Sequence, residues 1–344
     1  MRIFSAISAV FLCGLCDPIG LAIQNPASRR GRVLAENAGP NSSAMLPGMA
    51  EKPRIALVGA GNVASALAVS LRRAGYAIEA VVARSNAASL GKARRLAKKV
   101  GSRAIRLADL GKSRPLRAAV IWLCVPDSEI ARAARALSGK IAWKGTVALH
   151  SSGALTSDEL APLRERGAAV GSAHPLMTFV RGFADSRASL SGVPFAIEGD
   201  ARAVRAARAM VASMGGEAYA IRKEHKAAYH AWGMFASPLL DALLATTERV
   251  AGFAGVGPKE ARRRMIPILR QTLANYGELG APGAFSGPIV RGDVETVGKH
   301  LKALREIPIA LDVYVALAGA ALQYLSAKEK GALRKLLNLA KVTR

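Results

Sequence analysis

The sequence predicts an α/β protein with a doubly wound parallel sheet, followed by a separate all-α domain. Short apolar runs alternate with helix-forming stretches up to about residue 221, which is typical of a parallel sheet with helices on both faces. Beyond residue 222 nearly every segment has helical composition. A Gly-x-Gly turn joins the first apolar run to the first helix, where sheets of this class bind ligands.

Several segments have the composition of buried strands, because aliphatic and β-branched residues cluster between glycines and polar turns. Helices are expected between them, and Ser157 has the side chain to start one of these helices. We place the first domain at residues 52–200 and the helical domain at 201–344. The expected strands are 54–59, 77–85, 103–109, 118–130 (ending in a Val-Pro-Asp turn), 145–153, 168–179, 194–200 and 217–221, and the helices of this part are 62–75, 86–101, 157–167 and one between the last two strands.

The helical domain contains one segment that is apolar almost all round, residues 307–325. Such a helix is buried inside its own domain or against a second subunit, and symmetric pairing is the commonest form of assembly. We therefore expect a homodimer that forms through this domain. A glycine-rich stretch, residues 277–293, is expected to be the one long loop between its helices.

The glycine turn has the sequence Gly59-x-Gly61-x-x-Ala64 and lies between an expected strand and an expected helix. The first glycine permits the tight turn, the second allows a pyrophosphate to approach the backbone, and the third position packs helix on strand, where alanine is accepted. Backbone N–H groups and the helix dipole then meet the phosphate charge. The motif predicts a dinucleotide site formed by Gly59, Gly61, Asn62, Val63 and Ala64, with Val125 and Pro126 at the end of a neighbouring strand.

The next strand indicates which dinucleotide binds. An NAD site needs an acid about 20 residues beyond the glycines to hold the ribose 2′-hydroxyl. Glu79 falls too early in its strand, and the strand tip carries Arg84 and Ser85 instead. An arginine can pair with a 2′-phosphate, and a serine can donate a hydrogen bond to it. The sequence therefore favours NADP over NAD.

The charge of the chain is extreme: 49 Lys and Arg against 24 Asp and Glu give a net charge of +25. The arginines are scattered through alanine-rich helices, and aromatic residues form only 5% of the chain, which disfavours nucleic-acid binding as the main function. The positive electrostatic field of the chain would attract a phosphorylated ligand instead. No apolar run reaches the about 18 to 20 residues of a membrane span. The sequence predicts no metal site.

The chain begins with a leader whose first 16 residues have one basic residue followed by an apolar stretch of signal-peptide length. Read literally, this predicts secretion. The alternative is that translation starts at Met45 or Met49, so that residues 1–51 lie outside the working protein. We favour this alternative and a cytoplasmic protein, since the glycine motif indicates an intracellular cofactor. The three cysteines form no disulfide framework, which suits a reducing compartment.

Several further stretches, among them "VPDSEI", "HSSGAL", "GSAHPLMTF", "YHAWGMFAS" and "GPIVRGDVETVGKHL", resemble a family in which a Rossmann-like domain precedes the helical domain of unknown function 2520. That family is similar to deazaflavin-dependent NADP reductases, ketopantoate reductases and pyrroline-carboxylate reductases. The resemblance covers about residues 52–325. It implies an NADP-linked oxidoreductase with its active site between the domains, and a helical domain like the C-terminal one of 6-phosphogluconate dehydrogenase. A flavin or deazaflavin as the hydride partner is a further option.

Hydride transfer needs a proton source beside the nicotinamide. His150 lies at a strand end and could supply the proton, with Ser151 and Ser152 orienting the substrate; the alternative is a structural histidine bonded to a loop carbonyl. His174 precedes Pro175 and could serve instead, or could only fix that turn.

The helical domain could contribute substrate contacts through four residues. Lys226 and His230 share a helix face and could close the cleft, although an interdomain structural histidine is the alternative. Arg291 and Asp293 could contact an anionic substrate, although Asp293 is also well placed to cap the following helix. Together these residues predict an NADP-dependent reductase of a small carbonyl or imine compound. The alternative is a non-catalytic NADP-binding redox sensor or scaffold.

Overall fold

The computed structural model describes residues 52–84, 86–112, 115–180 and 189–342. The expected leader and Ser85, one of the expected cofactor contacts, lie outside the described residues.

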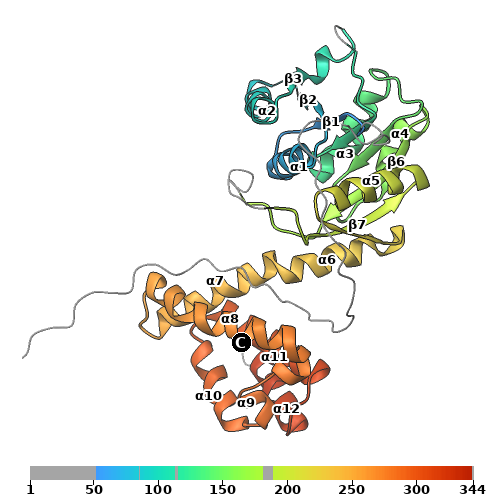
Figure 1. Ribbon diagram of the computed structural model, residues 1–344. Helices are drawn as coiled ribbons and strands as arrows, with labels where there is room; N and C mark the ends of the chain where they lie inside the picture. Colours follow the sequence, from blue (N-terminus) through green and yellow to red (C-terminus); the bar gives the residue numbers. More distant parts are fainter. Residues whose placement is uncertain (1–51, 85, 113–114, 181–188, 343–344) are drawn as a thin grey trace, which may run out of the picture. The chain divides into compact units, whose positions relative to one another are not determined.

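The described strands form one eight-stranded sheet with the order β3-β2-β1-β4-β5-β6-β7-β8 (Figure 1). Strands β1 to β6 are all parallel, β7 is antiparallel to β6, and β8 is parallel to β7. The sheet therefore continues past residue 200, where the first domain was expected to end. The strands are β1 Ile55–Val58, β2 Ile78–Ala83, β3 Arg103–Arg106, β4 Val120–Leu123, β5 Val147–His150, β6 Ala169–Pro175, β7 Pro194–Gly199 and β8 Glu217–Ala220.

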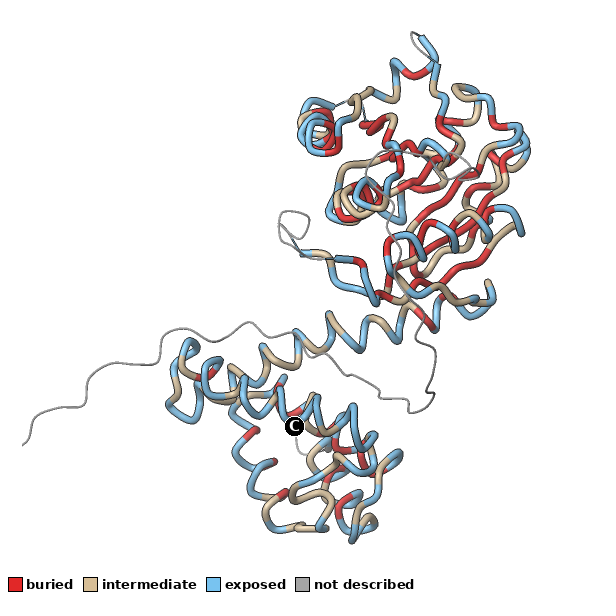
Figure 2. Tube along the Cα trace, in the orientation of Figure 1, coloured by how far each residue is buried: buried red, intermediate tan, exposed pale blue. Residues whose placement is uncertain are grey.

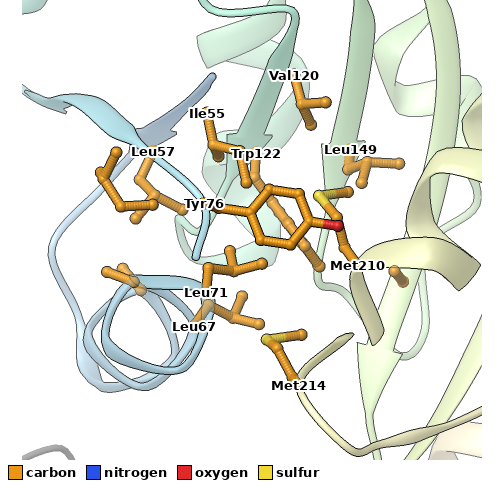
Figure 3. Packing of buried hydrophobic residues seen from close by; sticks show 14 of the residues in the cluster. Ile55, Leu57, Leu67, Leu71, Tyr76, Val120, Trp122, Leu149, Met210 and Met214 are labelled. Atoms are coloured by element: carbon orange, nitrogen blue, oxygen red, sulfur yellow. The ribbon is translucent and has the colours of Figure 1, made fainter. Parts of the chain in front are cut away.

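Helices cover both faces of the sheet, which confirms the doubly wound prediction. One face packs against α1 (Asn62–Arg73), α2 (Ala87–Val100) and α5 (Ala201–Ser213), and the other against α3 (Asp127–Ser138) and α4 (Ala161–Arg164). In the first of these cores the ring of Tyr76 lies among aliphatic side chains of the strands, α1 and α5 (Figure 3). The alternating strand residues belong to the second core. Burial of both sheet faces is the reason that these strands read as continuous apolar runs.

The rest of the chain is helical, as the sequence predicts. Its helices are α6 Lys226–Ala236, α7 Pro238–Phe253, α8 Pro258–Ala284, α9 Pro288–Arg291, α10 Val294–Leu304, α11 Pro308–Tyr324 and α12 Lys330–Val342, with short 3-10 turns at Leu107–Asp109, Ser157–Leu160 and Lys223–His225 elsewhere in the chain. Helices α10, α11 and α12 share a core of their own. None of the described helices is long and apolar enough to cross a membrane.

Two local expectations are wrong. Residues 277–293 do not form one long loop, because α8 continues to Ala284 through a bend at Gly280 (φ +68°) and α9 follows. Gly280 adopts non-helical backbone angles that kink α8, and Gly292 (φ +72°) is the C-cap of α9. The turn at 157–160 is capped by Thr156, whose side chain accepts from the Asp158 N–H, rather than by Ser157. Ser157 is instead buried and bonded to Glu198.

Candidate functional site

The two glycines of the turn between β1 and α1 differ: the backbone requires a glycine at residue 59, whereas the space beside Gly61 is open. Gly59 has φ +105°, and a Cβ there would lie 2.3 Å from the carbonyl oxygen of Cys124. A Cβ on Gly61 would meet no atom within 4 Å. Gly61 is the N-cap of α1, and the first N–H groups of a helix have no intrahelical partner. A phosphate group fits this position, and a side chain at residue 61 would fill it.

A cavity of about 530 Å³ extends from this turn along the ends of β1, β2 and β4. Its walls include the expected residues Gly59, Gly61, Arg84, Val125 and Pro126, together with Lys92 of α2 and Glu129 and Arg132 of α3. Ala64 does not line it: the residue is fully buried in the core that α1 shares with the sheet, as its packing role requires. Val63 is partly buried against the same core.

The cavity also brings an acid next to Arg84. A carboxylate oxygen of Glu129, Oε2, lies 3.8 Å from Nη1 of Arg84, and it also pairs with Arg132. NADP is expected from the sequence because the tip of β2 carries Arg84 and no acid. An acid from another part of the chain is not visible in that local pattern. Glu129 comes from α3, which follows a different strand, so its position depends on the sheet order.

The buried polar side chains of the described residues lie on or next to β5, β6 and β7. Nζ of Lys226 donates to the carbonyl oxygen of Ser152 (2.9 Å) and to Oγ of Ser172 (2.6 Å). The Ser152 hydroxyl donates to Oδ2 of Asp127 (2.7 Å). Glu198 pairs with Ser172 across β6 and β7. These buried residues are His150, Ser152, Ser157, Ser172, Glu198 and Lys226.

Lys226 is fully buried, and both of these hydrogen bonds go to uncharged oxygens. Burial lowers the pKa of its ammonium group to about 8, while the charges of Glu198 and Asp127 act in the opposite direction. At neutral pH the side chain therefore remains a buried cation.

His150 is also fully buried, and both of its ring nitrogens are used. Nδ1 accepts from the Ser152 N–H at 3.1 Å, and Nε2 lies 3.0 Å from the carbonyl oxygen of Thr156, to which it donates. Burial lowers the pKa of this ring to about 4, so the ring is neutral. The contacts correspond to the structural alternative considered for His150: the ring holds the loop that follows β5.

His174 lies at the end of β6 and contacts α6. Its Nδ1 lies 2.8 Å from the hydroxyl oxygen of Tyr229, and its ring lies edge-on to that of His230, with centroids 5.9 Å apart. Burial is the main reason that the pKa of His174 falls to about 4, and the charge of Lys226 lowers it further. His174 and His230 line a cavity of about 360 Å³ together with residues 176–178, 233–234 and 236–238.

Gly153 explains how the loop after β5 passes so close to both histidines. A Cβ at this residue would lie 2.6 Å from Cδ2 of His230 and 2.9 Å from Nε2 of His174. The carboxyl ends of β1, β4, β5 and β6 lie on one edge of the sheet, because these strands are parallel. The glycine turn, the loop after β5 and the His174 cluster therefore share this edge, where doubly wound sheets bind ligands.

Two family models match the sequence. The model of a Rossmann-like domain matches residues 38–175, and the model of a domain of unknown function, DUF2520, matches residues 193–321. The chain pairs a Rossmann-like domain with a DUF2520 domain. The DUF2520 match begins one residue before β7, so it includes the last two strands of the sheet as well as helices up to α11.

Solved structures share this fold. A Bacteroides fragilis protein assigned as an NADP oxidoreductase is 23% identical, with 78% of this chain and 98% of that one covered and a TM-score of 0.64. A Thermotoga maritima protein is 21% identical (83% and 99% covered, TM-score 0.60). A pyrroline-5-carboxylate reductase from Coxiella burnetii is 14% identical (84% and 98% covered, TM-score 0.51). No curated protein matches the sequence.

The remaining predicted residues lie in several places. In the Rossmann-like domain, Oγ of Ser151 accepts from the Trp122 indole N–H (2.9 Å), and the Asn62 amide donates to the carbonyl oxygen of Phe179 (2.8 Å). In the DUF2520 domain, Asp293 caps α10 by accepting from the Thr296 N–H, which is the capping alternative. Neither Arg291 nor Asp293 lines either of the two cavities described above.

Sequence reasoning missed three groups at the site. Tyr229 directly precedes His230 in the sequence, and its spacing of three from Lys226 on one helix was a usable signal. Gly153 lies in the stretch that contains both predicted serines, but a single glycine gives no sign of a close approach. Lys92, Glu129 and Arg132 lie on helices with many charged residues, so only the folded sheet distinguishes them.

Proposed function

We propose that the protein is an NADP-dependent oxidoreductase that transfers a hydride between the nicotinamide and a small carbonyl or imine compound, in the cleft at the carboxyl edge of the sheet. One observation carries the proposal: the open glycine turn at Gly61 and the His174–Tyr229 pair lie on the same edge of one parallel sheet. The similarity in fold to the Bacteroides fragilis protein and to the pyrroline-5-carboxylate reductase supports it.

Gly59, Gly61 and the first turn of α1 would hold the pyrophosphate, with Val125 and Pro126 against the adenosine half. Arg84, Lys92 and Arg132 would attract a 2′-phosphate, which favours NADP over NAD. When bound, the reduced nicotinamide supplies the hydride. A flavin or deazaflavin as the second hydride partner is a variant of this proposal.

The role that we propose for His174 is to donate a hydrogen bond to the heteroatom of the substrate. In this proposal Nδ1 of the neutral ring accepts from the Tyr229 hydroxyl, which places the ring proton on Nε2. A neutral imidazole can stabilise a carbonyl oxygen that gains negative charge during reduction. His230, on the wall of the same cavity, would help to bound the substrate.

Lys226 favours a carbonyl over a protonated imine as the substrate. Lys226 does not line the cavity of His174 and His230, but its positive charge lowers the pKa of His174. A nearby cation stabilises an oxygen that becomes negative and opposes a substrate that is already positive. Lys226 is a positioning residue in this proposal, because its contacts hold the loop after β5 against β6.

The test combines binding with turnover. NADPH and NADH are titrated against the protein by cofactor fluorescence, and NADPH oxidation is then followed with a panel of small ketones, aldehydes and cyclic imines. Oxidation with ketones or aldehydes that is lost in His174→Asn, with NADPH binding retained, is the expected result. Tight NADPH binding with no turnover in the whole panel would favour the redox sensor or scaffold instead.

We also propose a homodimer, whose interface is larger than the segment 307–325 expected from the sequence. Helix α7 has no buried residue, and Ala261 is the one residue of α8 that is buried (Figure 2). Large apolar side chains are exposed along α7, α8 and the end of α6, whereas α11 buries one face in the core that it shares with α10 and α12. An exposed apolar surface of this extent is typical of an interface with another protein chain. Its residues are Trp232, Met234, Phe235, Leu239, Phe253, Ile266, Ile268, Leu273, Tyr276 and Leu279.

A further inference from the structure

The adenosine end of the cofactor cavity contains one acid among three basic residues. Arg84 follows β2, Lys92 lies on α2, and Glu129 and Arg132 lie one turn apart on α3. Oε2 of Glu129 pairs with Arg132 and lies 3.8 Å from Nη1 of Arg84. The same carboxylate oxygen thus faces guanidinium groups from two different elements.

These ion pairs are of a kind that a ligand can replace. The side chains of Arg84 and Arg132 are 55% and 65% exposed, and that of Glu129 is 22% exposed. Water therefore reaches both arginines, and exposed ion pairs of this type contribute little to stability. A phosphate monoester carries more negative charge than a carboxylate and offers three acceptor oxygens, so it competes well for the same guanidinium groups.

We propose that Glu129 determines the cofactor specificity of this cavity by competing with the 2′-phosphate of NADP for Arg84 and Arg132. This inference rests on the proposed function, because it takes the cavity to be the dinucleotide site. When NADP binds, the 2′-phosphate replaces the carboxylate as the partner of the arginines. When NAD binds, no phosphate is present and Glu129 keeps both partners.

The charges of the cluster favour competition over a second role for Glu129. A carboxylate at the ribose can also accept hydrogen bonds from the ribose hydroxyls, as in NAD sites. In this cavity, however, the carboxylate oxygen is already engaged by two arginines, and three basic groups face one acid. Removal of Glu129 leaves the arginines free for an anion, whereas removal of an acid that binds the ribose 2′-hydroxyl would weaken the binding of NAD, since NADP has no free 2′-hydroxyl.

The experiment measures the dissociation constants of NADPH, NADH and adenosine 2′,5′-bisphosphate for the wild type and Glu129→Gln. Glu248→Gln is the matched control, because it removes the same charge from an acid that pairs with Arg262 on α8 and does not line the cavity. We expect Glu129→Gln to bind NADPH and the bisphosphate about three- to tenfold more tightly, in line with the strength of charge-assisted phosphate contacts. NADH should change by less than about twofold, and Glu248→Gln should change none of the three.

A second variant tests the arginine that the sequence did not indicate. Arg132→Gln should weaken NADPH and the bisphosphate and leave NADH unchanged, and the effect of Glu129→Gln on NADPH should become smaller in the Arg132→Gln background. Repeating the titrations at high salt should reduce the difference between the wild type and Glu129→Gln.

Two results would overturn the inference. Clearly weaker binding of NADH in Glu129→Gln would mean that the carboxylate binds the ribose hydroxyls, and an unchanged NADPH-to-NADH ratio would mean that it does not contact the 2′ position. Both can occur while the proposed function holds. Wild-type binding without turnover would contradict the proposed function alone, and a wild type that binds none of the three nucleotides would contradict both.

Discussion

Nδ1 of His174 lies 2.8 Å from the hydroxyl oxygen of Tyr229, which connects the end of β6 to the first turn of α6. Lys226, in the same turn, reaches the loop after β5. Tyr229 and Lys226 therefore join the first helix after the sheet to the carboxyl edge of the sheet, and burial shifts the pKa of both His174 and Lys226.

Removal of the Tyr229 hydroxyl should lower turnover without affecting the cofactor. In Tyr229→Phe, Nδ1 of His174 loses its partner, so the proton is no longer confined to Nε2. We expect kcat to fall by roughly 10- to 100-fold, which is less than the ~10²- to 10³-fold for loss of the donor itself because His174 is retained, with NADPH affinity unchanged. The effect should largely disappear in a His174→Asn background. Full additivity of the two substitutions would show that the pair does not act as a unit.

The two glycines of the cofactor turn should respond differently to alanine. Gly59→Ala places a Cβ 2.3 Å from the Cys124 carbonyl oxygen at a φ of +105°, and we expect it to lower the free energy of unfolding by at least about 2 kcal/mol. Gly61→Ala meets no atom within 4 Å, so it should fold with a loss below about 1 kcal/mol. Gly61→Ala should nevertheless lose NADPH binding. Urea unfolding and fluorescence titration measure the two effects separately, and normal NADPH binding by Gly61→Ala would place the pyrophosphate elsewhere.

Acid should destabilise the protein through His150. Its pKa falls from 6.5 in the unfolded chain to about 4 in the fold, because of burial. Between these values the unfolded chain binds a proton that the folded protein does not, so stability falls as pH falls from 6.5 towards 4. The contribution of this one ring reaches about 3 kcal/mol at the low end. Urea unfolding at pH 7 and pH 5 should show a smaller loss in His150→Gln than in the wild type, and an equal loss would assign the effect to other groups.

Lys226 should make the stability of the protein depend on pH in the alkaline range. Burial lowers its pKa from 10.5 to about 8, so between these values the unfolded chain holds a proton that the folded protein has released. Stability of the wild type relative to Lys226→Met should therefore rise by about 2 kcal/mol from pH 8 to pH 10. The comparison with Lys226→Met removes the contributions of other groups. A difference that does not change with pH would mean that Lys226 stays charged throughout.

The exposed apolar surface on α6, α7 and α8 should hold the homodimer together. Leu273 is 62% exposed on α8, and an aspartate in its place would put a charge in the proposed interface at little cost to the monomer fold. We expect Leu273→Asp to shift the mass measured by light scattering from dimer to monomer at micromolar concentration. Ile309→Asp, on the exposed side of α11, should leave the dimer intact. The opposite pattern would place the interface on α11, as the sequence alone suggested.

The cofactor turn shows which features of the site can be predicted from local sequence. Gly59, Gly61 and Ala64 could be assigned roles from their spacing, because a strand, a turn and a helix that follow one another involve only near neighbours in the chain. Ala64 is indeed buried in the core and not in the cavity. The acid beside Arg84 could not be found in this way. Glu129 reaches that position because β4 is placed next to β1 in the sheet, a pairing that no local pattern encodes.

The roles of the two histidines at the other end of the site could likewise not be predicted from local sequence. The sequence by itself determined the fold class, the alternation of strands and helices and the strand ends that carry His150 and His174, since burial of both sheet faces and helix periodicity leave regular patterns along the chain. Only the tertiary structure decided which histidine is enclosed by backbone contacts and which one lines a cavity with Tyr229 and His230 beside it. The physical reason is that the solvation and hydrogen-bond partners of a side chain depend on elements distant in sequence, and those determine both its pKa and its access to a substrate.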